Sequence, residues 1–130
     1  MGPTARRWGL ENPPDAPADK SPMETENLLD NLPHQPPQEV LTTILQADGL
    51  RLQRIVSQGH ASPPGFWYDQ DDNEWVMLLA GSATVEFEGD AEPRRLRPGS
   101  YLNIPAHARH RVLATDPRQK TVWLAVHYRT

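Results

Sequence analysis

Residues 74–89 read EWVMLLAGSATVEFEG, and this stretch decides the fold class. Glu74 and the apolar run that follows it, over 75–80, together have the length of a strand; a Gly–Ser pair comes next, and residues 83–89 alternate apolar with polar side chains. Alternation with a period of two is the pattern of a half-buried strand, and Gly81-Ser82 is typical of a tight turn. The stretch therefore predicts two consecutive β-strands joined by a short connection.

Similar short patterns lie on both sides of this stretch. We expect further strands at residues 50–57, 94–96, 101–104, 110–114 and 121–128, separated by turn-forming residues. Residues 66–70 are rich in β-favouring side chains, and residues 39–46 suit either a strand or a helical turn. Nothing after residue 46 has helical periodicity. Roughly eight or nine short strands with regular turns indicate an all-β sandwich or barrel.

The N-terminal part has a different composition. Eight of the 14 prolines fall in the first 37 residues, and residues 1–22 carry few apolar side chains. Such a segment cannot bury enough surface to offset the ordering of its backbone, so we predict a disordered extension over 1–22. Residues 23–38 are predicted to form a short helix, at Glu26–Leu32, and a linker. Residues 39–130 are predicted to form one compact domain.

Composition excludes several classes of protein. The 130-residue chain has no cysteine, which excludes disulfides, thiolate metal sites and cysteine nucleophiles. Its formal net charge is −4, so it lacks the basic surface expected of a nucleic-acid-binding protein. The longest apolar run, Trp75–Gly81, is far shorter than a membrane-spanning helix, and the first residues have no signal-peptide pattern. We therefore expect a cytoplasmic protein whose partners include neither nucleic acid nor a membrane.

Side chains with metal-ligand chemistry gather in two segments, Tyr68–Glu74 and His107–His110. Glu74 begins a strand that is apolar on both faces, so its carboxylate has to be solvated, paired with an arginine, protonated or bound to a cation. His110 either forms a hydrogen bond near the surface or points into the core. If the two segments face each other, their imidazole, carboxylate and carboxamide groups suit a divalent metal ion.

The same segments resemble the two motifs of the cupins. In the first motif, G-x5-H-x-H-x3,4-E-x6-G, Glu74 and Gly81 occupy the last two positions. In the second motif, G-x5-P-x-G-x2-H-x3-N, the matches are Gly99, Pro105 and His110. The resemblance covers residues 39–128 and is to compact bacterial single-domain cupins. It implies a double-stranded β-helix, or jelly-roll barrel, preceded by the disordered extension and one short helix.

The chain departs from these motifs at several positions. Depending on the spacing before the glutamate, the two histidines of the first motif are replaced by Tyr68 and Gln70 or by Trp67 and Asp69. His107 stands where the second motif has a glycine. Only two of the four usual metal ligands of the family therefore carry over directly.

The resemblance implies a metal site built from a reduced set of ligands. The candidate ligands are Gln70, Glu74, His110, His107 and Asp69. Such a site would suit zinc, nickel, manganese or iron without choosing between them. Tyr68 and Glu74 are the candidate catalytic, proton-handling groups. Two functions stay open: a metal-dependent enzyme acting on a small polar substrate, and a non-catalytic small-ligand-binding or sensor module.

The apolar side chains opposite Glu74 predict an association surface. Trp75, Met77 and Leu79 share the face of the strand that Glu74 does not occupy. Large exposed apolar patches usually mark interfaces, so we expect a homodimer. The alternative cover is an N-terminal segment, with Leu28, Leu29 and Leu32, folding back within the same chain.

Overall fold

The computed structural model describes residues 24–130, and the extension predicted to be disordered lies outside the described residues. Within the described part the chain is all-β, as predicted. Its strands are β1 (Val40–Ala47), β2 (Leu50–Ser57), β3 (Asn73–Ala80), β4 (Ala83–Phe87), β5 (Arg94–Leu96), β6 (Tyr101–Ile104), β7 (His110–Thr115) and β8 (Thr121–Tyr128). Residues 39–46, whose sequence suits either a strand or a helical turn, lie almost entirely in β1.

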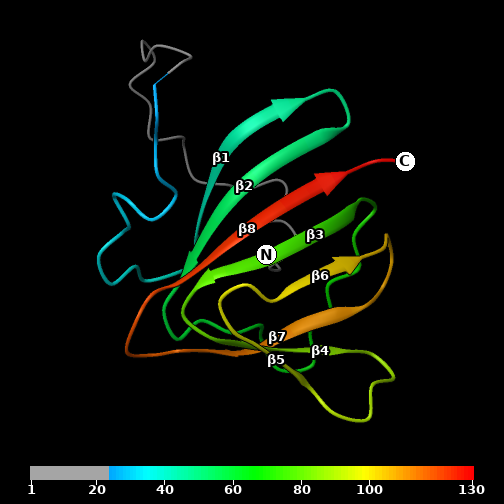
Figure 1. Ribbon diagram of the computed structural model, residues 1–130. Helices are drawn as coiled ribbons and strands as arrows, with labels where there is room; N and C mark the ends of the chain where they lie inside the picture. Colours follow the sequence, from blue (N-terminus) through cyan, green and yellow to red (C-terminus); the bar gives the residue numbers. More distant parts are fainter. Residues whose placement is uncertain (1–23) are drawn as a thin grey trace.

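The strands form two sheets, which Figure 1 shows packed one above the other. The larger sheet has the order β1-β2-β8-β3-β6, and the smaller one has the order β5-β4-β7. All neighbouring strands are antiparallel. From β3 onward the chain passes repeatedly between the sheets, which gives the jelly-roll arrangement.

The core lies between the two sheets and takes apolar side chains from both. Its buried members are Leu41, Ile55, Val76, Leu78, Ala83, Val85, Leu96, Ile104, Val112, Trp123 and Ala125. Residues directly opposite each other on neighbouring strands point to the same face of a sheet. One such row, Ile55–Trp123–Leu78, forms the apolar part of the inner face of the larger sheet.

Four residues further along these strands the inner face becomes polar. There the row consists of Arg51 on β2, His127 on β8 and Glu74 on β3, followed by Ile104 on β6. Strand geometry returns a side chain to the same face every second residue, so the two rows belong to one surface. The change from apolar to polar along this face positions the candidate site at one end of the barrel.

The short helix expected at Glu26–Leu32 is absent, and a turn takes its place. The Leu29 N–H donates to Asn27 Oδ1 at 2.8 Å, and the Asp30 N–H donates to the Asn27 carbonyl at 3.1 Å. This Asx turn offers the backbone an alternative to a helix. The Arg54 guanidinium holds the turn against β2 by donating to the carbonyls of Leu28, at 3.2 Å, and of Asp30, at 2.8 Å.

Residues 66–70, which have strand-like composition, form only an isolated bridge. The Tyr68 N–H donates to the His110 carbonyl at 2.7 Å, and the His110 N–H donates back to the Tyr68 carbonyl at 3.2 Å. This bridge ties the long connection after β2 to the start of β7. Within residues 24–130 there is no helix long and apolar enough to cross a membrane.

Candidate metal centre

Glu74 lies at the centre of the polar inner face. It is the second residue of β3, and its side chain is fully buried. Its cross-strand neighbours are His127 on one side and Ile104 on the other. A buried carboxylate requires compensating groups, because an isolated charge is costly to remove from water. Two imidazoles, one from each sheet, approach its two oxygens.

His110 approaches Glu74 from the smaller sheet. It is 3% exposed, and its Nε2 atom lies 3.9 Å from Oε1 of Glu74. Its other ring nitrogen, Nδ1, lies 2.8 Å from the carbonyl oxygen of Ala108. Since a carbonyl only accepts hydrogen bonds, Nδ1 carries the proton. In the neutral imidazole, Nε2 then presents its lone pair toward the carboxylate.

His127 approaches the other carboxylate oxygen and was not among the candidates from the sequence. Its Nε2 atom lies 3.9 Å from Oε2 of Glu74, and it is 1% exposed. The strand alternation contained a signal for it, because Trp123, Ala125 and His127 share one face of β8. His127 follows these two buried residues on the same face, and it becomes a site candidate once the pairing of β8 with β3 places it opposite Glu74.

Aromatic rings hold His110 in place. The ring of Tyr68 stacks on it with the centroids 5.3 Å apart, and the ring of Phe87 lies 5.7 Å away. Phe66 packs edge-on against Tyr68 at 5.4 Å. Together with the two backbone hydrogen bonds to Tyr68, these contacts fix the orientation of the imidazole toward Glu74.

Gln70 is buried, with 8% of its surface exposed. Its amide nitrogen, Nε2, has no hydrogen-bond partner among residues 24–130. The backbone carbonyl oxygen of Gln70 accepts from the His107 backbone N–H at 2.8 Å, which fixes the backbone next to the site. Tyr68 and Gln70 are thus both buried, whereas the side chain of Asp69 between them is half exposed.

Solved structures with this fold include several cupins. The cupin superfamily protein DSY2733 from Desulfitobacterium hafniense is 18% identical with a TM-score of 0.66, over 84% of this chain and 94% of its own. A cupin-2 domain protein from Shewanella frigidimarina is 16% identical with a TM-score of 0.54, over 68% of this chain and 79% of its own. At these identities the likeness shows the fold.

A third structure is much more similar in sequence. It is described as a putative mannose-6-phosphate isomerase from Ralstonia eutropha JMP134, and it is 50% identical, with a TM-score of 0.80. The match covers 82% of this chain and 99% of that one. The chain has the cupin fold. No protein-family model and no curated protein matches it.

Two of the expected ligands of this chain lie outside the barrel. Asp69 and His107 have side chains that are 50% and 63% exposed, and Oδ1 of Asp69 lies 2.7 Å from Nδ1 of His107. This hydrogen bond, assisted by the charges of Asp69 and Asp71, raises the pKa of His107 above its ordinary value of 6.5. The structure does not bring these side chains together with the buried Glu74.

The position of His107 in the cupin motif explains why it points outward. Its φ is +66°, in the left-handed region that glycine adopts most readily. The second motif has a glycine at this position. His107 therefore supplies the turn that leads into β7, as the glycine would, and its imidazole is left on the surface.

The residues present fit a metal ion in part. Two ligands on opposite sides of a metal at about 2.1 Å would be about 4.2 Å apart, so each 3.9 Å separation can span one ion. Within residues 24–130, however, no group of three or more His, Cys, Asp or Glu side chains is arranged closely enough to hold a metal as it stands. A three-ligand site needs a small movement of side chains around Glu74.

Proposed function

We propose that this chain binds a divalent metal ion inside the barrel through Glu74, His110 and His127, with Gln70 as a further neutral donor. The observation that carries the proposal is the tautomer of His110. Its Nδ1–H is committed to the Ala108 carbonyl, so a neutral ring turns a lone pair toward Oε1 of Glu74. Two buried acceptors facing each other are unfavourable unless a proton or a metal ion lies between them, and a metal ion is the occupant we propose.

The hydrogen bond from Nδ1–H of His110 to the Ala108 carbonyl supports a metal ion at this place. Histidines that bind metals almost always donate their other N–H to a carbonyl or a carboxylate, which fixes the ring and makes Nε2 a better ligand. The mixture of imidazole and carboxylate suits zinc, nickel, manganese or iron. When bound, such an ion would polarise an oxygen of a small polar substrate or hold that substrate in place.

The chain's own residues would then divide the work around the bound molecule. Tyr68, stacked on His110, and Glu74 remain the candidates for holding or moving a proton. Arg51 lies opposite His127 in the register and shares the inner face with Glu74. A guanidinium at that place suits a phosphate or carboxylate group on the substrate.

The metal content of the full chain, purified without a nickel column, tests the proposal. We expect a stoichiometric transition metal in the wild type and in His107→Ala, because His107 lies on the surface. The variants Glu74→Gln, His110→Ala and His127→Ala should lose it. An equal loss in His107→Ala would move the site to the surface pair, and no metal in the wild type even after reloading would refute the proposal.

Activity separates the two functions that the fold leaves open. The relative from Ralstonia makes the isomerisation of mannose 6-phosphate the first reaction to assay. Turnover by the metal-loaded chain, weakened in Arg51→Gln, would support an enzyme acting on a sugar phosphate. Binding of the sugar phosphate without turnover would support a non-catalytic ligand-binding module.

A further inference from the structure

A cavity lies next to Tyr68, the residue whose ring stacks on His110. It has a volume of about 320 Å³ and is formed by the segment before β1, the loop after β2, and strands β7 and β8. Glu39, His60, Tyr68 and Trp123 are among the residues that line it. This volume is at the lower end of the range for small-molecule sites.

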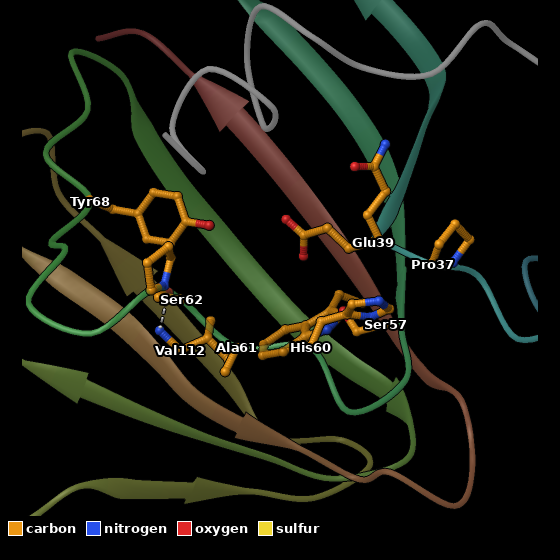
Figure 2. A pocket seen from close by; sticks show the side chains of 11 residues that line it. Pro37, Glu39, Ser57, His60, Ala61, Ser62, Tyr68 and Val112 are labelled. Atoms are coloured by element: carbon orange, nitrogen blue, oxygen red, sulfur yellow. Dashed lines mark hydrogen bonds between the residues drawn. The ribbon is translucent and has the colours of Figure 1, made fainter. Parts of the chain in front are cut away.

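Glu39 places a carboxylate in this cavity. Figure 2 shows its side chain extending from the start of β1 toward the hydroxyl of Tyr68. Glu39 is 8% exposed, and Oε1 has no hydrogen-bond partner among the described residues. The lining contains no lysine or arginine. A buried carboxylate without a cationic partner is costly, so its charge needs a positive group from elsewhere.

His60 is the lining residue whose side chain could carry a positive charge. Its Nδ1 accepts a hydrogen bond from the Gln58 N–H at 2.8 Å. A protonated Nδ1 would lose this bond and would face the Gln58 N–H as a second donor. The hydrogen bond in the loop after β2 therefore uses Nδ1 of His60 as an acceptor rather than as a cationic donor.

Trp123, which also lines the cavity, has a hydrogen-bond donor that needs an acceptor. It is 2% exposed, and its indole Nε1 has no hydrogen-bond partner among residues 24–130. An indole N–H only donates, so it needs an acceptor. The same wall holds two aromatic residues, Tyr68 and Trp123, whose rings favour a nearby organic cation.

We infer that this cavity binds a small organic amine in its protonated form, with the ammonium group on Glu39 and an oxygen of the same molecule accepting from Trp123. One ligand of this kind satisfies both unpartnered groups and fits a cavity of this size. The site is separate from Glu74 and His127, and its occupation does not depend on a bound metal.

Binding of 5-aminopentan-1-ol to the chelator-treated full chain tests the inference, with pentane-1,5-diol as the neutral counterpart. The amine should bind and shift the indole N–H resonance of Trp123, assigned with Trp123→Phe, and the diol should not. Replacing a charge-assisted hydrogen bond by a neutral one in Glu39→Gln should weaken binding roughly tenfold or more. Glu92→Gln, a change at an exposed glutamate, should leave binding unchanged.

Thermal unfolding gives a second readout that does not require binding. Because Glu39→Gln removes a buried charge without a described partner, it should unfold at the same temperature as the wild type or higher. A marked loss of stability would show that Glu39 has a structural partner and would overturn the inference. Equal affinity for the amine and the diol, unchanged affinity in Glu39→Gln, or no binding of the amine would also overturn it.

Discussion

Gly81 directly follows β3, the strand that carries Glu74, and its replacement by alanine should be among the most destabilising small changes in the chain. Its φ is +85°, and a Cβ atom added there would lie 2.6 Å from the Cα of Thr121 and 2.7 Å from the carbonyl oxygen of Lys120. Both are backbone atoms at the start of β8. That segment is also fixed by the Thr121 hydroxyl, which donates to the Ser82 carbonyl at 3.1 Å.

The expected cost has two parts. Placing a side chain in the left-handed region costs roughly 1–2 kcal/mol. Forcing an extra carbon into a packed contact costs roughly 1–3 kcal/mol more. The free energy of unfolding should therefore fall by about 2–5 kcal/mol, out of the roughly 5–15 kcal/mol typical of a domain.

Gly49→Ala is the matched control for this prediction. Gly49 also has a positive φ, of +71°, but an added Cβ would meet nothing within 4 Å. Urea unfolding of the two variants should differ by the cost of the clash alone, about 1–3 kcal/mol. If Gly81→Ala costs no more than Gly49→Ala, the close approach of β8 to the turn after β3 does not matter and the reasoning is wrong.

Three further predictions concern the surface and the ends of the chain. Nuclear magnetic resonance should give His107 a pKa above 6.5, and this pKa should fall in Asp69→Asn. The contribution of the His107–Asp69 pair to the stability of the fold is then fully present below pH 6.5 and is lost as the pH rises through the raised pKa. Light scattering should show a homodimer, and Tyr101→Asp should weaken it, because Tyr101 is 65% exposed on the face outside the barrel. A dimer that Tyr101→Asp leaves unchanged would place the interface elsewhere. Deleting residues 1–22 should leave the melting temperature unchanged. Deleting residues 1–37 should lower it, because the longer deletion also removes the carbonyls that bind Arg54. An equal fall in melting temperature for the two deletions would contradict this prediction.

The strands were predictable because their patterns are local. Alternation over 50–57 and 121–128 gives β2 and β8 within the described bounds, since one face of each strand is buried against the opposite sheet. The turn at Asn27 was missed for a local reason too. Its side chain competes with helix formation, and a Pro-rich sequence adds no packing to favour the helix.

The site was predictable only in part because it depends on strand pairing. Glu74 and His110 could be found from motif spacing, but His127 requires the knowledge that β8 lies between β2 and β3. The choice between Asp69 and Gln70 depends on the bridge of Tyr68 with His110, which turns Gln70 inward. Long-range pairing of this kind leaves no periodic signal in the sequence.

Anomalous diffraction from crystals of the full chain grown with manganese or zinc would test the central claim most directly. The account predicts an anomalous peak inside the barrel, about 2.0–2.2 Å from Nε2 of His110 and from the carboxylate of Glu74. Nε2 of His127 should lie within reach of the same ion. A peak only at the surface pair of Asp69 and His107, or no peak inside the barrel, would contradict it.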